Sequence, residues 1–215
     1  MPTTLPITLF YAPQTRATGV RVLLDELGAP YRLHALNRNA DDHRSDAFLA
    51  VNPLGKVPAV TVGDTLITEQ GAIYTYLADL FPEAGLAPAL DDPLRGAYLR
   101  WLFLYGSCLE PAVVDRFMER EPGPRGMSPY GTYDAVLDLI VAQLTPGPYL
   151  FGERFTAADL LWGTALSWLT AFKLVPEDPP IRDYVKRIQA RPIVQRVQAD
   201  DAELAKRHQA EAVRA

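Results

Sequence analysis

Three side chains within six residues could stabilise an anion: Tyr11, Thr15 and Arg16. The first two carry hydroxyl donors, and the third carries a permanent positive charge. Each also has an ordinary alternative role: Tyr11 could be an aromatic residue lining a pocket, Thr15 a helix N-cap, and Arg16 an exposed arginine on a helix surface. Their segment, YAPQTRAT (residues 11–18), has no cysteine, and the chain has no CxxC pair. Redox chemistry of the CxxC kind is therefore excluded.

A second polar group, Glu69 and Gln70, stands at the start of an apolar helical pattern. A helix N-terminus offers free N–H groups and a partial positive charge, which together can hold a carboxylate. The Gln70 amide can donate to such a ligand, and Glu69 can accept from an ammonium group. Lys56 follows a glycine in a turn and could bind a carboxylate through its positive charge. An ordinary solvent-exposed lysine in a turn is an equally good interpretation.

The composition excludes several other functions. The 215 residues carry a net charge of −5, from 26 acidic against 21 basic side chains, without a Lys/Arg block. Nucleic acid and anionic membranes are therefore poor partners, and no apolar run approaches the ~20 residues that span a bilayer. His34, His43 and His208 lack metal-ligand spacing, and Cys108 is a single cysteine in an apolar helix. We expect a soluble cytoplasmic protein with no metal site.

The first eighty residues alternate strands with helices, and these elements must position the polar groups. Apolar runs and turn signals predict strands over 5–11 and 31–36, helices over 15–27, 42–50 and 69–81, and a hairpin of 59–62 with 65–68 around Gly63-Asp64. The first strand–helix–strand unit implies a parallel pair with a right-handed crossover.

The patterning becomes helical after a linker rich in Pro, Ala and Asp. We expect helices over 94–119, 130–144, from 157 onward, 181–190 and 193–208, the third opened by a Thr156–Asp159 capping box. The predicted domains are 1–82, a linker at 83–92, and an all-helical domain at 93–215. The fold class is α/β plus all-α.

The segment Asn52–Pro82, NPLGKVPAVTVGDTLITEQGAIYTYLADLFP, resembles the glutathione-binding half of a cytosolic glutathione transferase of bacterial type, with the class left open. YLFGERFTAADL and YVKRIQARPIVQRV resemble the family's C-terminal domain, so the resemblance covers the whole chain. It implies a thioredoxin-like βαβ-ββα domain followed by a helical bundle. It also implies a cis peptide bond before Pro58, where the Val57 backbone meets an extended peptide ligand.

The resemblance implies glutathione as co-substrate, held by Lys56, Val57, Pro58, Glu69 and Gln70. The family commonly has a Glu-Ser pair at the start of the third helix, and here Gln70 replaces the serine. Its amide can still donate a hydrogen bond to the γ-glutamyl carboxylate.

The residue that activates the thiol differs between classes of the family. Family members use a tyrosine, serine or cysteine near the end of the first strand, and the cysteine position here is Arg16. Cysteine-type chemistry is therefore excluded, and Thr15, Tyr11 and Arg16 remain as candidates. Lowering a thiol pKa by two units from ~8.5 requires about 2.7 kcal/mol of thiolate stabilisation.

The implied function is conjugation of glutathione to an apolar electrophile, as in detoxification, by a homodimer. The implied electrophile pocket comprises Ala12, Tyr98, Leu102 and Tyr105. Two alternatives remain open: a glutathione-binding protein of this fold with little or no turnover, and a glutathione-dependent isomerase or dehalogenase.

Overall fold

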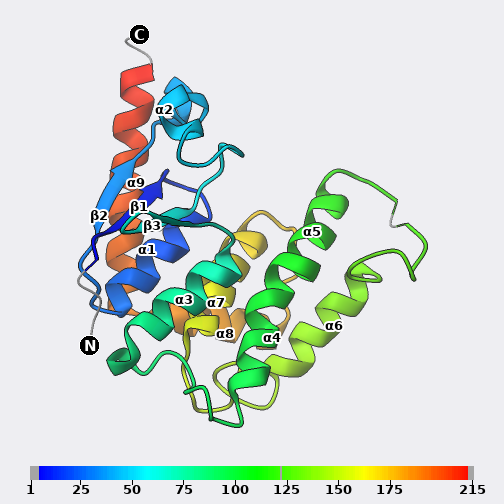
Figure 1. Ribbon diagram of the computed structural model, residues 1–215. Helices are drawn as coiled ribbons and strands as arrows, with labels where there is room; N and C mark the ends of the chain where they lie inside the picture. Colours follow the sequence, from blue (N-terminus) through cyan, green and yellow to red (C-terminus); the bar gives the residue numbers. More distant parts are fainter. Residues whose placement is uncertain (1–4, 122, 213–215) are drawn as a thin grey trace. The chain divides into compact units, whose positions relative to one another are not determined.

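The computed structural model describes residues 5–121 and 123–212 and divides into two compact units (Figure 1). One unit combines the residues up to Ala84 with those from Pro192 onward, and the other spans Gly85–Arg191. This division differs from the predicted boundary, which places all of 93–215 in one helical domain. The last helix groups with the N-terminal residues because it makes its contacts on that unit's first helix and on the turn after its second strand.

A four-stranded mixed sheet forms the centre of the first unit, in the order β2-β1-β3-β4. The strands are β1 (Ile7–Tyr11), β2 (Arg32–Ala35), β3 (Ala59–Val62) and β4 (Thr65–Ile67). As predicted, β1 and β2 are parallel, and β3 and β4 form a hairpin whose Gly63 has φ +58. Strand β3 pairs with β1 in the antiparallel direction. The thioredoxin-like sheet expected from the sequence is confirmed.

Helices cover the sheet of this unit. They are α1 (Ala17–Glu26), α2 (Asp46–Leu49), α3 (Gln70–Leu80) and α9 (Pro192–Ala212), with 3-10 turns η1 (Arg38–Ala40), η2 (Asp42–Arg44) and η3 (Pro82–Ala84). Alternate β1 residues Ile7, Leu9 and Tyr11 are buried on one face. Phe10 points to the other face, where it packs against the cluster of Leu36, Phe48 and Ala59.

The helix predicted over 42–50 is wrong in detail, because only its last turn is α-helical. Local hydrogen bonds compete with the helix here. Asp41 adopts φ 58, and the Asp42 carboxylate accepts from the backbone N–H of Asn37 at 2.8 Å. Ser45 then takes an extended conformation, and its hydroxyl accepts from the Phe48 N–H, so that it caps the short α2.

The second unit is helical, as predicted. It contains α4 (Arg95–Leu104), the π-helical turn η4 (Tyr105–Leu109), α5 (Glu110–Phe117), α6 (Tyr133–Leu144), α7 (Ala157–Ala171) and α8 (Pro179–Gln189). The sequence predicts one helix over 94–119, whereas the structure inserts the π turn. Pro111 explains this difference, because proline lacks an N–H and its ring crowds the carbonyl four residues earlier.

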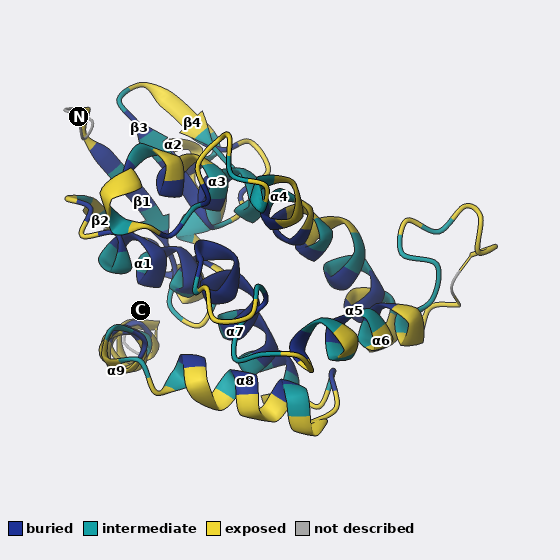
Figure 2. Cartoon of the chain, turned by 90° about the horizontal axis from the view of Figure 1, so that it is seen from below, coloured by how far each residue is buried: buried dark blue, intermediate teal, exposed yellow. Residues whose placement is uncertain are grey.

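Helix α7 forms the core of the second unit and is buried over most of its length (Figure 2). The predicted capping box is present: Thr156 and Asp159 satisfy each other's backbone N–H groups. Gly163 allows α8 to approach closely, since a Cβ at this position would lie 2.5 Å from Cγ1 of Ile188. The indole of Trp162 donates to the Trp101 carbonyl at 2.9 Å, which ties α7 to α4.

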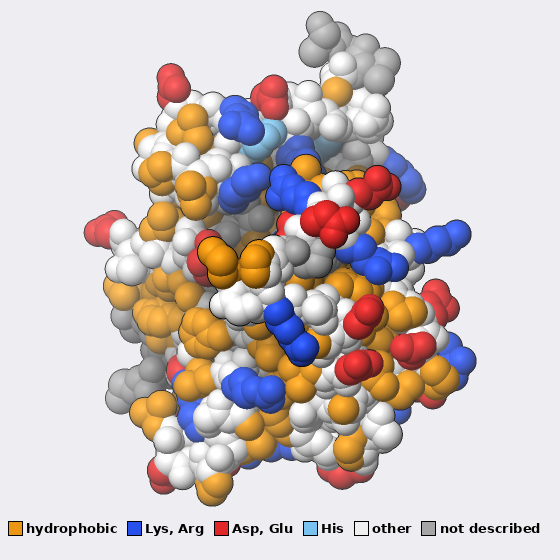
Figure 3. Space-filling model, turned by 90° about the vertical axis from the view of Figure 1, so that its right-hand side faces the viewer, with side chains coloured by type: hydrophobic (Ala, Val, Ile, Leu, Met, Phe, Trp, Pro, Cys, Tyr) orange, Lys and Arg blue, Asp and Glu red, His pale blue; other side chains and the backbone are white. Residues whose placement is uncertain are grey.

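Three features concern membrane spans, metal ligands and surface charge. No helix within 5–121 and 123–212 combines the length and apolarity needed to cross a bilayer. The same residues contain no group of His, Cys, Asp and Glu side chains that could hold a metal ion. On the face drawn in Figure 3, basic and acidic side chains are interspersed.

Candidate functional site

The loop before Pro58 is shaped by Asn52, which is 3% exposed. Its side-chain amide donates to the Lys56 carbonyl at 2.8 Å and its side-chain oxygen accepts from the Leu54 N–H at 3.2 Å. The Val57–Pro58 peptide bond is cis, as the sequence predicts. Pro58 is buried, Val57 is half-buried, and Lys56 is exposed beside them. The loop therefore presents a fixed backbone with a cation next to it.

Helix α3 begins with an unusual residue. Glu69 is exposed and has φ 64 and ψ 121, a conformation that costs a non-glycine residue about 1–3 kcal/mol. The Glu69 side chain makes no capping hydrogen bond, so the first N–H groups of α3 receive no acceptor from it. Such an end attracts a carboxylate. Glu69 and Gln70 thus lie at the start of α3, which is where we expect the carboxylate and the ammonium group of a ligand to bind.

The loop between β1 and α1 holds the three candidates for thiol activation. Tyr11 is fully buried, and its hydroxyl donates to the Asp201 carboxylate. The Thr15 hydroxyl donates to the Ala12 carbonyl at 2.7 Å and accepts from the Ala17 N–H at 3.2 Å. Arg16, not Thr15, occupies the N-cap position of α1, and it is exposed. Both hydroxyl protons are therefore directed into the protein itself.

These three segments lie at one edge of the sheet. Phe10 of β1 pairs with Ala59 of β3 in an antiparallel register, so the residues that follow Phe10 and those that precede Ala59 leave the sheet at the same end. The Gln70 amide lies 3.5 Å from the Arg16 carbonyl, which brings the start of α3 to the start of α1. The predicted residues of the first unit are thus brought together.

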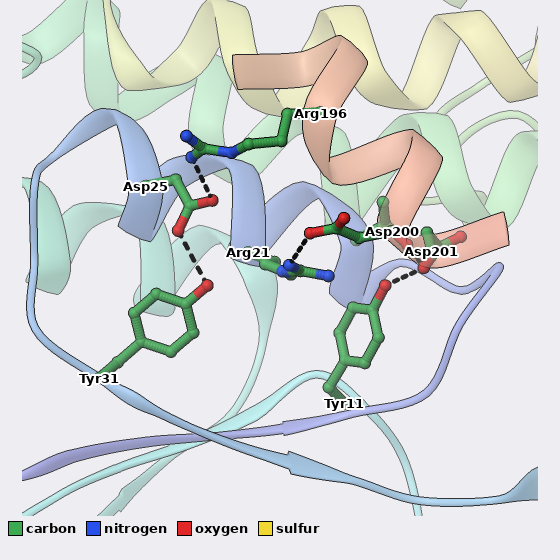
Figure 4. A network of polar contacts seen from close by, with 8 residues as sticks. Tyr11, Arg21, Asp25, Tyr31, Arg196, Asp200 and Asp201 are labelled. Atoms are coloured by element: carbon green, nitrogen blue, oxygen red, sulfur yellow. Dashed lines mark hydrogen bonds and ion pairs between the residues drawn. The ribbon is translucent and has the colours of Figure 1, made fainter. Parts of the chain in front are cut away.

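A residue absent from the sequence prediction reaches the same loop. Asp201 on α9 accepts from the Tyr11 hydroxyl (Figure 4). It also accepts from the backbone N–H of Gln14 at 2.9 Å and from the Thr18 hydroxyl at 3.0 Å. Burial raises the pKa of Asp201 to about 6. The neighbouring Asp200 pairs with Arg21 of α1, whose guanidinium lies 5.9 Å from the centre of the Tyr11 ring.

A signal in the sequence could have identified this carboxylate. The buried positions of α9 are Val194, Val197, Asp201, Leu204 and His208, spaced by three and four residues. Asp201 therefore stands on the apolar stripe of an amphipathic helix, where a carboxylate needs a partner in the protein.

The predicted electrophile-pocket residues of the second unit lie in its interior. Tyr98, Leu102 and Tyr105 are each no more than 2% exposed. The Tyr105 hydroxyl donates to the Glu110 carboxylate, and its ring meets Trp162 edge-on at 5.9 Å. Ala12, in the first unit, is also fully buried. Their contribution to a pocket stays a prediction.

Comparison with known proteins gives two domain matches. Residues 5–79 match the model of the glutathione S-transferase N-terminal domain, and residues 130–187 match that of the glutathione S-transferase C-terminal domain. A glutathione transferase from Methylococcus capsulatus superimposes with a TM-score of 0.77 at 30% identity, covering 91% of this chain and 98% of the other. A homologue from Sulfitobacter with bound glutathione gives a TM-score of 0.74 at 27% identity, covering 92% and 99%.

Curated relatives show that more than one activity occurs at this level of similarity. The disulfide-bond oxidoreductase YfcG of Escherichia coli K12 is 26% identical, over 86% of this chain and 91% of its own length. Glutathione S-transferase GstA of Escherichia coli O157:H7 is 30% identical over 195 residues, which are 87% of this chain and 94% of the relative. With the domain matches, this similarity over most of both chains shows that the chain belongs to the glutathione S-transferase family.

Proposed function

We propose that this protein is a glutathione transferase, which ionises the thiol of bound glutathione so that the thiolate attacks an electrophilic carbon of an apolar second substrate. One observation carries the proposal: the cis-proline loop, the start of α3 and the β1–α1 loop meet at one edge of the sheet. The glutathione bound to the Sulfitobacter homologue supports the same ligand.

The ligand contacts follow from the chemistry of each segment. The γ-glutamyl carboxylate would lie at the N-terminus of α3, where it receives backbone N–H groups and the Gln70 amide. Glu69 would accept from the γ-glutamyl ammonium. The peptide part would pair with the Val57 backbone against Pro58, and Lys56 would meet the glycine carboxylate. Every charged group of glutathione then has a partner of opposite charge or a dipole.

We propose Arg16 as the main stabiliser of the thiolate because it is the one candidate of the three that carries a permanent positive charge. For Thr15 or Tyr11 to donate to sulfur, its hydroxyl must first leave the Ala12 carbonyl or the Asp201 carboxylate. Arg16 is exposed at the start of α1 and keeps its charge at all relevant pH values. The helix dipole of α1 acts in the same direction. Most of the rate would come from this stabilisation and from proximity.

The homodimer is part of the same proposal. It rests on family likeness, and the exposed apolar side chains Tyr76 on α3 (42% exposed) and Phe103 on α4 (55% exposed) support it. Light scattering at micromolar concentration tests it, because a mass near 24 kDa instead of twice that value would contradict a dimer. That the second substrate is apolar is likewise proposed from family likeness.

A second candidate function is a glutathione-binding protein with little or no turnover. The specific observation in its favour is that both hydroxyl candidates already donate within the protein. Ultraviolet absorbance in the thiolate band, measured on adding glutathione at neutral pH, separates the two functions. We expect the band to appear and a generic aryl halide to be conjugated. Glutathione binding by calorimetry without either signal would establish the binding protein instead.

A variant series then assigns the thiolate stabiliser. We expect Arg16→Ala to raise the pKa of the bound thiol and to lower kcat more than Thr15→Ala or Tyr11→Phe does. Arg182→Ala, which removes an exposed arginine of α8, is the matched control and should change neither quantity. Equal activity in all four variants would show that none of the three residues stabilises the thiolate.

A further inference from the structure

The Asp201 carboxylate joins three consecutive pieces of the first unit. Its Oδ1 accepts from Tyr11 at the end of β1 and from Thr18 in the first turn of α1, and its Oδ2 accepts from the backbone N–H of Gln14 between them. The residue is 7% exposed. A buried carboxylate with three donors is held in one orientation, and it holds the donors in turn.

Hydrogen-bond donors, not a cation, balance the charge of Asp201. Within residues 5–121 and 123–212, no Lys, Arg or His forms an ion pair with it. Arg21 of α1 is the nearby cation, and it pairs with Asp200 while lying over the Tyr11 ring. Since burial raises the pKa of Asp201 to about 6, the carboxylate is mostly ionised at neutral pH and protonated in mild acid.

The bond from Gln14 bears on the loop conformation. Gln14 has φ 56, in the left-handed region that non-glycine residues avoid. Its N–H donates to Asp201 in this conformation, so the carboxylate compensates for the unfavourable backbone. Thr15 and Arg16 follow directly, and Thr18 is tied to the same carboxylate. Thr15 and Arg16, two of the candidates for thiol activation, thus lie between two residues that are hydrogen-bonded to Asp201.

We propose that Asp201 is a positioning residue for glutathione activation: by fixing Tyr11, Gln14 and Thr18 together, it sets the conformation in which the start of α1 meets the thiol. This inference rests on the proposed function. The carboxylate does not touch glutathione and acts through the loop. Helix α9, which is distant in sequence, thereby becomes part of the machinery of a site built from the first seventy residues.

The decisive variant is Asp201→Asn. Asparagine keeps the shape of the side chain but replaces one acceptor oxygen with an NH₂ group, which cannot accept. The asparagine oxygen can still meet Gln14 or the two hydroxyls, but the full set of three bonds is lost. The matched control is Asp200→Asn, which weakens another contact of α9 with α1 through Arg21 and leaves the three donors to Asp201 in place.

Three quantities should be measured at neutral pH: the pKa of the bound glutathione thiol by ultraviolet titration, kcat with an aryl halide, and KM for glutathione. For Asp201→Asn we expect the thiol pKa to rise by about one unit and kcat to fall about tenfold or more, with KM changed less than about threefold. Asp200→Asn should match the unmodified protein. Unchanged thiol pKa and kcat in Asp201→Asn, or equal losses in both variants, would overturn the inference.

A measurement on the unmodified protein guards against a variant that does not fold. The backbone amide signal of Gln14 in a ¹H–¹⁵N correlation spectrum should shift with a midpoint near pH 6, where Asp201 titrates. A Gln14 signal that does not titrate there would contradict the contact. A thiolate band that is absent from the unmodified protein refutes the proposed function itself, whereas a band that is present and insensitive to Asp201 refutes only the positioning role.

Discussion

The carboxylate of Asp159 in the second unit offers the sharpest prediction of stability. Its oxygens accept from the Leu150 N–H and the Thr156 N–H, both at 2.8 Å, and from the Thr156 and Tyr184 hydroxyls at 3.0 and 3.1 Å. Asp159→Ala leaves two buried backbone donors without an acceptor, at about 1–3 kcal/mol each. The Tyr184 hydroxyl keeps the Asp159 carbonyl at 3.2 Å as a partner, so it adds little to the loss.

One effect opposes this loss. Burial raises the pKa of Asp159, which means that folding penalises the ionised side chain, and its removal returns part of that penalty. We therefore expect the free energy of unfolding to fall by about 3 kcal/mol, measured by urea titration. The control is Asp178→Ala at the N-cap of α8, where the exposed carboxylate makes no capping hydrogen bond, with a cost below about 1 kcal/mol. Similar losses in both variants would refute the argument from buried donors.

Three further predictions concern other parts of the fold. Because the pKa of Asp201 is raised to about 6 from 3.8, the folded chain binds more protons than the unfolded chain between these values. The free energy of unfolding should fall as pH rises through this window, by at most about 3 kcal/mol. Urea titrations at several pH values should show a smaller fall for Asp201→Asn. The same pH dependence in both proteins would contradict the raised pKa of Asp201. Gly163→Ala places a Cβ against Ile188 and should cost about 1–3 kcal/mol, with a less than additive loss when combined with Ile188→Ala; strict additivity in the double variant would exclude the contact. Glu69→Gly relieves a positive φ of 64 and should raise the unfolding free energy by about 1 kcal/mol while weakening glutathione binding in calorimetry; unchanged affinity would remove Glu69 from the site.

The sequence predicts the elements that follow simple periodicity, together with the motif around the cis proline. β1, α1, the hairpin and α7 with its capping box lie close to where the patterns place them. The failures are physical in origin. Side-chain hydrogen bonds shorten the predicted helix at 42–50, and Pro111 forces a π turn into the predicted helix at 94–119. Neither effect is visible in hydrophobic spacing.

The candidate site was predictable in part. Residue type and motif indicate Lys56, Val57, Glu69 and Gln70, and the sheet register brings their segments to the β1–α1 loop. The direction of the Tyr11 hydroxyl was not predictable, because its acceptor lies 190 residues away on α9. Pairing at such separation is decided by tertiary packing, and a single sequence holds only the indirect signal of a carboxylate on an apolar helix face.

The membership of α9 in the first unit has a consequence for how the protein is made. A ribosome completes the sheet and α3 long before it reaches Pro192, and the whole second unit is synthesised in between. Until α9 emerges, Tyr11, Gln14 and Thr18 lack their common acceptor. Domains tend to fold as they appear during synthesis, but this one has to wait for a segment more than a hundred residues later. The nascent chain therefore carries an unfinished N-terminal unit, and α9 completes it only late in translation.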